Sequence, residues 1–111
     1  MYAALFEMTS WMGNRQYIFK GNSATVLLSE FEAIQDLGCL VRMGRGQEDT
    51  KGQKELDKLE AILDKYYDGT LTPDDLLTLD ISISLGTIKC VCIEEGADAA
   101  DKLKAQYPTA R

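Results

Sequence analysis

Three cysteines are the most reactive side chains of a chain that has 111 residues and no histidine. Cys90 and Cys92 lie on one face if their segment is an extended strand, and with Cys39 they offer three thiolates to a soft metal. Paired zinc motifs, however, usually have more residues between the two cysteines, and free cysteine is commonly a buried core residue. We therefore predict reduced thiols without a metal or another cofactor, with Cys90 and Cys92 buried in the core and unreactive.

The missing histidine also narrows the catalytic chemistry. It excludes a Ser-His-Asp triad, a Cys-His pair, a histidine-ligated zinc site and an imidazole pH switch. The adjacent carboxylates of Glu94 and Glu95 can in principle do acid–base work. Neighbouring side chains at the end of a strand point in different directions, so these two residues are not a natural dyad. The sequence thus predicts a protein that is not an enzyme.

An acidic segment in the second half of the chain has oxygen-bearing side chains and a glycine at the spacing of a calcium loop. The residues that fit the loop positions, in order, are Asp64, Asp68, Gly69, Leu71, Thr72 and Asp75. The segment thereby resembles a degenerate EF-hand loop, and this resemblance implies oxygen ligands for a calcium ion. It departs from the pattern because Tyr66 occupies the third ligand position and Asp75 is shorter than the usual glutamate. A helix that ends at Gly69 and another that starts at Thr72 explain the same residues, and we expect no metal here.

Trp11 and Met12 stand together in a predicted loop, and Met8 is nearby. Tryptophan and methionine are enriched at the cores of protein interfaces. The loop either folds back on the sheet or binds a partner. We single out Met8, Trp11 and Met12 as candidate partner-binding residues, and a second copy of the same chain is the commonest kind of partner.

The charge balance of the chain is acidic, with 18 Asp and Glu against 12 Lys and Arg and a net charge of −6. Because no basic run is present, we expect no direct binding to nucleic acid or to an anionic membrane surface. Acidic side chains in the place of phosphates would instead suit an inhibitor of a nucleic-acid-binding protein. The candidate acidic surface consists of Asp64, Asp68, Asp74, Asp75, Asp80, Glu94, Glu95, Asp98 and Asp101.

A single arginine between two glycines, Gly44-Arg45-Gly46, is the remaining motif. Such an arginine can hold a phosphate or a carboxylate. The Gly-Lys-Ser/Thr ending of a phosphate-binding loop is absent, however. We therefore predict a mobile connection through Thr50.

Apolar periodicity and capping residues position the elements that carry these side chains. Strands are predicted at residues 2–8, 15–20, 39–43, 77–85 and 87–93. After Gly21-Asn22, residues 23–27 complete a hairpin, or residues 21–28 lead into the next helix. Helices are predicted from the capping box that begins at Ser29 to a stop at Gly38, over residues 51–67, from Thr72 onward, and over residues 97–107.

These elements predict one α+β domain over residues 1–111, with an antiparallel sheet of about four to six strands and about three helices packed on one face. The longest apolar run, residues 1–6, is too short for a transmembrane span or a signal peptide, so we expect a cytoplasmic protein. We predict a small non-catalytic module that acts through protein–protein contacts, as a homodimer with Trp11 and Met12 at the interface. The alternatives are the acidic inhibitor and a small-molecule-binding domain.

Overall fold

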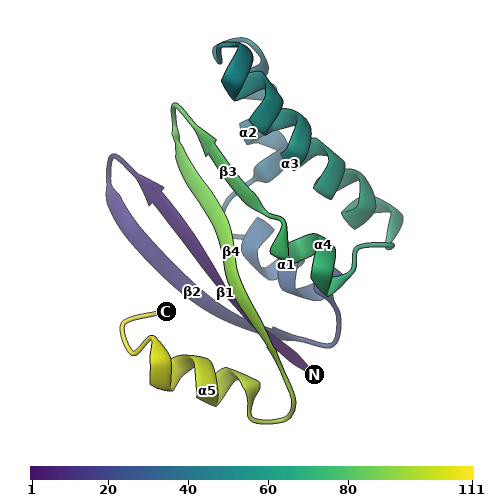
Figure 1. Ribbon diagram of the computed structural model, residues 1–111, viewed down its shortest axis with the longest axis vertical. Coiled ribbons are helices and arrows are strands. Elements are labelled where there is room, and N and C mark those ends of the chain that lie inside the picture. The colour runs from purple at the N-terminus through teal and green to yellow at the C-terminus, as the bar shows by residue number, and fades with distance from the viewer.

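A twisted antiparallel sheet runs through the middle of the molecule (Figure 1). The computed structural model describes residues 1–111. Its four strands are β1 (Tyr2–Ser10), β2 (Gly13–Gly21), β3 (Asp80–Ile83) and β4 (Gly86–Glu95). They lie in the order β2-β1-β4-β3, so that β1 and β4 are central and β2 and β3 are the edges. The strand count agrees with the expected four to six.

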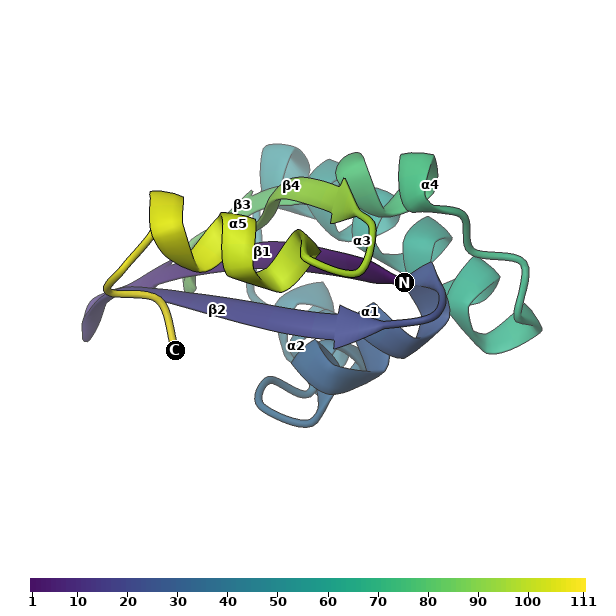
Figure 2. The same cartoon turned by 90° about the horizontal axis from the view of Figure 1, so that it is seen from below.

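Five helices cover both faces of this sheet (Figure 2). They are α1 (Ala24–Glu32), α2 (Leu37–Arg45), α3 (Thr50–Asp68), α4 (Pro73–Leu77) and α5 (Ala99–Gln106). The first four lie on one face and α5 lies on the other. The expected number of about three helices is roughly consistent with this structure, but their expected packing on a single face was wrong. The reason is visible in β1, where Ala3, Ala4, Leu5 and Phe6 are all fully buried. An uninterrupted apolar run in a strand needs cover on both sides.

The two faces have cores of different size. The larger core joins the sheet to α1–α4, and in it the ring of Phe6 stacks on the ring of Phe31 with centroids 4.7 Å apart. The smaller core joins Ala3 and Leu5 of β1 to Leu103 of α5. No helix is both long and apolar enough to cross a membrane.

A β-bulge in β4 separates the two cysteines that the sequence placed on one face. Leu5 pairs with Cys92 while the next residue, Phe6, pairs with Cys90, so Val91 is an extra residue in the ladder. The extra residue reverses the alternation of the strand. Cys90 consequently joins the larger core, and Cys92 packs against the smaller one. The prediction of a shared face was therefore wrong.

Helix α1 begins earlier than the capping box at Ser29 predicted. Ser23 is its N-cap and accepts a hydrogen bond from the backbone N–H of Val26, at 3.3 Å. The segment after Gly21 thus leads into a helix and forms no third hairpin strand, which confirms the second of the two alternatives. Because the helix ends at Glu32, it does not reach Gly38.

The predicted strand over residues 39–43 is instead part of α2. Asp36 caps this helix, and its Oδ1 accepts a hydrogen bond from the backbone N–H of Cys39 at 2.9 Å. The buried residues of the helix recur at helical spacing and are Leu37, Leu40, Val41 and Gly44. A Cβ on Gly44 would lie 2.6 Å from Cδ1 of Leu56 in α3, so the glycine lets the two helices pack closely.

The longest helix and the turn after it follow the prediction. Helix α3 ends at Gly69, which adopts a left-handed conformation with φ of 74°. Thr72 then starts α4 with Pro73 in its first turn. The alternation over residues 77–85 produces a strand only at Asp80–Ile83, because the start of that segment belongs to α4 and its end to the turn before Gly86.

Candidate functional site

Both β-hairpins turn at the same end of the sheet (Figure 1). A groove of about 460 Å³ is lined by residues of these two hairpins and of α2. Three parts of the chain line it: the β1–β2 hairpin, the β3–β4 hairpin, and α2 with the connection that precedes it. The sheet and α2 therefore form its walls. Its position at the tips of both hairpins depends on the antiparallel pairing of β1 with β2 and with β4.

Four of the ten hydrophobic residues that line this groove contain sulfur. Met8, Met12, Met43 and Cys39 all line it. The thiol of Cys39 donates to the thioether of Met43, with Sγ and Sδ 3.7 Å apart. Met12 and Met43 are 62% and 48% exposed, so the lining is open to solvent. Methionine is flexible and polarisable, and it suits surfaces that adapt to an apolar partner.

Trp11 stands beside the groove in the β1–β2 turn, between the lining residues Ser10 and Met12. Its side chain is 91% exposed, so it does not fold back on the sheet. The turn itself is held by a hydrogen bond from the backbone N–H of Met12 to Oγ of Ser10, at 3.2 Å. The hairpin thus presents the largest aromatic side chain of the protein to solvent.

A close backbone approach shapes the floor of the groove. Gly86 begins β4 with φ of 144°, a conformation that side-chain-bearing residues rarely adopt. A Cβ at this position would collide with the carbonyl group of Thr9 in β1. The glycine therefore allows the second hairpin to lie against the first one at the groove.

Comparisons of the chain with protein-family models, with curated proteins and with solved structures found no match.

The residues that line the groove determine what it can bind. Arg15 and Asp36 are its only charged residues, and Asp36 already caps α2. Nowhere in the chain do three Asp, Glu or Cys side chains gather as a metal site would need. The lining is therefore suited to bind apolar side chains, and Arg15 and Asp36 add one cation and one carboxylate to it.

The thiols lie in three different surroundings. Cys39 lines the groove, Cys90 is 2% exposed in the larger core, and Cys92 is half-buried beside α5. Burial raises the pKa of the Cys90 thiol to about 12, with a smaller contribution from Cys92. Burial also raises the pKa of Cys92, and the neighbouring carboxylate of Glu94 adds to this effect. The expected burial is confirmed for Cys90 and is partial for Cys92.

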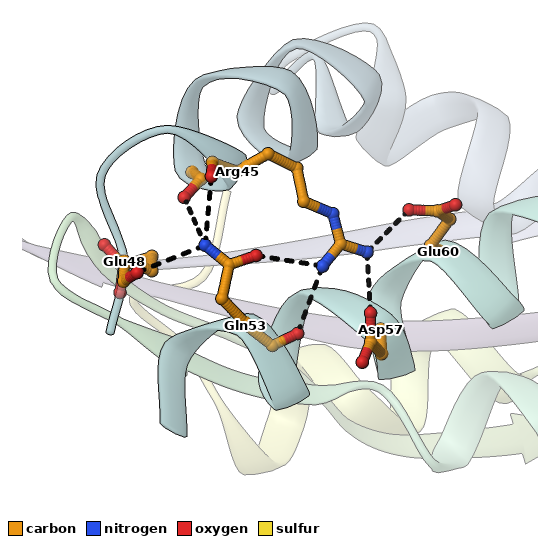
Figure 3. Close-up of polar contacts among 6 residues, drawn as sticks. Arg45, Glu48, Gln53, Asp57 and Glu60 are labelled. Atoms are coloured by element: carbon orange, nitrogen blue, oxygen red, sulfur yellow. Dashed lines mark hydrogen bonds and ion pairs between the residues drawn. The ribbon is translucent and has the colours of Figure 1, made fainter. Parts of the chain in front are cut away.

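Arg45 does hold carboxylates, and they belong to its own chain (Figure 3). Its Nη2 lies 2.7 Å from Oδ1 of Asp57 and 2.7 Å from Oε2 of Glu60, both in α3. Its Nη1 donates to the side-chain Oε1 of Gln53 at 3.0 Å. The two carboxylates raise the pKa of the guanidinium, Glu60 most strongly. The arginine therefore joins α2 to α3 and is not a free anion site.

Gln53 completes this junction (Figure 3). Its Nε2 donates to the backbone carbonyl groups of Gly44, Arg45 and Glu48, at 3.2, 3.1 and 3.1 Å. Gly44 and Arg45 are the last two residues of α2, and Glu48 lies in the connection after it. The connection that the sequence predicted to be mobile is thus held by side chains of α3.

The acidic segment of the EF-hand resemblance forms a helix–turn–helix. The Asp75 carboxylate accepts a hydrogen bond from the backbone N–H of Thr72 and lies 2.9 Å from Nζ of Lys65. Lys65 first, and the bonds from Thr72 after it, hold the pKa of Asp75 below its ordinary value. Asp75 thereby forms a capping box with Thr72 at the start of α4.

The nine residues of the candidate acidic surface lie on several elements. Five belong to α3, α4 and β3, two are the last residues of β4, one is the N-cap of α5 and one lies within α5. In order they are Asp64, Asp68, Asp74, Asp75, Asp80, Glu94, Glu95, Asp98 and Asp101. The end of α3, α4 and the end of β4 lie away from the hairpin turns (Figure 1). The acidic residues are thus separated from the groove.

Proposed function

We propose that this protein is a binding module that acts through protein–protein contacts, and that two copies associate through the hairpin end of the sheet. The observation that carries the proposal is Trp11, which is 91% exposed next to a groove lined by three methionines. Exposed apolar surface of this kind marks an interaction site. Tryptophan is also among the residues that contribute most to binding energy at interfaces.

The same surface supports a partner identical to the chain itself. A two-fold dimer needs a patch that is complementary to its own copy. Here a projecting side chain, Trp11, lies beside a hollow that includes Met8 and Met12. In such a dimer the indole of each copy enters the groove of the other. A groove of about 460 Å³ has ample room for it, because cavities of this size accept drug-sized molecules.

That volume also favours a second candidate function, the binding of a small apolar molecule in the groove. It has less support because Met12 and Met43 remain largely exposed, whereas small-molecule sites enclose most of the ligand. An acidic inhibitor is the least supported of the three. Its nine acidic residues lie on both sides of the sheet, and Asp75 is engaged by Lys65 within the chain.

Light scattering on wild type and two variants tests the dimer. We expect a dimer at high micromolar concentration that Trp11→Ala weakens by about 2 kcal/mol, the effect of removing an interface hot spot. Tyr67→Ala is the matched control, because Tyr67 is a 66% exposed aromatic residue in α3, outside the groove. A monomeric wild type contradicts the proposal. Equal weakening by both substitutions contradicts the placement of the interface.

A further inference from the structure

The outward backbone groups of the two edge strands, β3 and β2, have different hydrogen-bond partners. Along β3 the backbone N–H of Ser82 donates to Oε2 of Glu55 at 3.1 Å. The N–H of Ser84, just beyond the strand, donates to Oε1 of Glu48 at 2.9 Å, and the Ser84 hydroxyl bonds to the other oxygen of the same carboxylate. Both carboxylates come from α3 or the connection before it. This edge is therefore closed to another strand, as native sheets commonly arrange.

Along β2 the backbone of Arg111 occupies part of the edge. The N–H of Arg111 donates to the carbonyl of Gln16 at 2.9 Å, and the N–H of Ile18 donates to the carbonyl of Arg111 at 3.0 Å. One residue bonded to both neighbours of Tyr17 in this way is the pattern of a parallel β-bridge. The segment after α5 thus already pairs with this edge as a strand would, over a single residue.

Most of the β2 edge remains open. Alternate residues of a strand direct both backbone groups to the same side, so Asn14 and Lys20 face outward together with Gln16 and Ile18. No hydrogen bond of the chain joins Asn14 or Lys20 to a further element along this edge. The nine-residue strand has no proline, and its register with β1 is continuous. It therefore has the length and regularity that strand addition requires.

The charge of β2 differs from that of the whole chain. The strand contains Arg15 and Lys20 and no acidic residue, although the chain has a net charge of −6. Arg111, which reaches the same edge, is also basic. An added strand with acidic side chains would complement Arg15 and Lys20. A second copy of β2 would bring like charges together and is disfavoured.

We propose that the free edge of β2 binds an extended, acidic segment of a partner protein, which adds parallel to the strand and takes the place of Arg111. The added backbone would bond to the outward groups of Gln16 and Ile18 that Arg111 now occupies, and then extend along Lys20. Arg15 and Lys20 would select acidic side chains. This binding rests on the backbone of β2 and does not depend on the proposed dimer.

Two blocked synthetic peptides test this inference, one alternating valine with glutamate and one alternating valine with lysine. NMR-detected amide exchange on the full chain should show that only the glutamate peptide binds, and that it protects the N–H of Lys20. A chain shortened to end at Pro108 should bind that peptide about tenfold more tightly, because two competing backbone hydrogen bonds are gone. Lys20→Glu should weaken binding, whereas Lys89→Glu, on β4, should leave it unchanged.

Equal binding of the two peptides, binding that leaves the Lys20 N–H unprotected, or no binding to the shortened chain overturns the inference. The same titration on Trp11→Ala separates it from the proposed function. Peptide binding that persists in a monomeric Trp11→Ala protein supports the β2 site alone. A dimer that forms normally while neither peptide binds removes the β2 site and leaves the groove intact.

Discussion

The Sγ of Cys39 lies 3.7 Å from the Sδ of Met43, one helical turn further along α2. Both residues line the groove, so this face of α2 forms part of the groove wall. It also places the most accessible reactive group of the groove wall where a partner would sit. A thiol reagent that modifies Cys39 can therefore be used to probe the proposed interface.

We expect a maleimide to modify Cys39 first under native conditions. Cys90 should stay unmodified because it is 2% exposed and its pKa is raised to about 12, which leaves almost no reactive thiolate at neutral pH. Cys92 should react more slowly than Cys39, because burial first and the carboxylate of Glu94 second raise its pKa. Peptide mapping by mass spectrometry measures the order. Fast modification of Cys90 in folded protein would show that β4 is packed differently.

A bulky adduct on Cys39 should fill part of the groove and weaken the proposed dimer. The effect should match that of Trp11→Ala in direction, because both remove the same contact. Cys39→Ser, treated with the same reagent, is the control for unspecific labelling. If the fully labelled protein keeps the dimer affinity of the unlabelled protein, the groove does not receive the partner.

Local signals in the sequence predicted some elements well and missed those set by tertiary contacts. Gly69, Thr72 and Pro73 determine the end of α3 and the start of α4 through backbone preferences, and these boundaries were correct. In α2 the apolar run around Cys39 concealed the helical spacing of the buried residues. The bulge at Val91 left no local pattern, because it depends on how β1 pairs with β4.

Only part of the groove lining was predicted from the sequence, for the same reason. Met8 and Met12 were found because they accompany Trp11, and tryptophan and methionine are enriched at the cores of interfaces. Cys39 and Met43 were missed because they reach the groove only through the packing of α2 across the sheet. Their spacing of four residues, which puts them on one helical face, was the available signal.

Replacing Gly86 by alanine should destabilise the fold strongly. The substitution forces a side chain into a left-handed backbone conformation and against the carbonyl of Thr9, and we expect a loss of about 2 kcal/mol or more. Urea denaturation measures the change. Gly46→Ala is the control, because its φ is −92° and its Cβ would meet nothing closer than 4.0 Å. Equal losses in the two variants would contradict the close approach of the hairpins.

Acid should weaken the closed edge at β3. The backbone N–H of Ser82 is the main cause that lowers the pKa of Glu55, with Lys58 adding to it. A carboxylate with a lowered pKa stabilises the folded state above its unfolded pKa, and this contribution is lost as pH falls through the folded value. Glu55→Gln should therefore cost about 1 kcal/mol at neutral pH and little at pH values below its folded pKa.

Urea midpoints across the acidic range measure this difference. Glu30→Gln serves as the control because Glu30 is exposed and makes no hydrogen bond or ion pair through its side chain. A Glu55→Gln protein whose stability follows that of wild type at every pH would show that the carboxylate does not hold the β3 edge.

The most direct test of the proposed dimer is the fluorescence of Trp11, the only tryptophan of the chain. In a single copy the indole is 91% exposed, so dilute protein should emit as a tryptophan in water does. If the indole enters the groove of a second copy, the emission should shift to shorter wavelength as the concentration rises. The midpoint of that shift should coincide with dimer formation by light scattering. An emission maximum that stays constant while the protein dimerises, or a protein that stays monomeric at high micromolar concentration, would contradict the proposal.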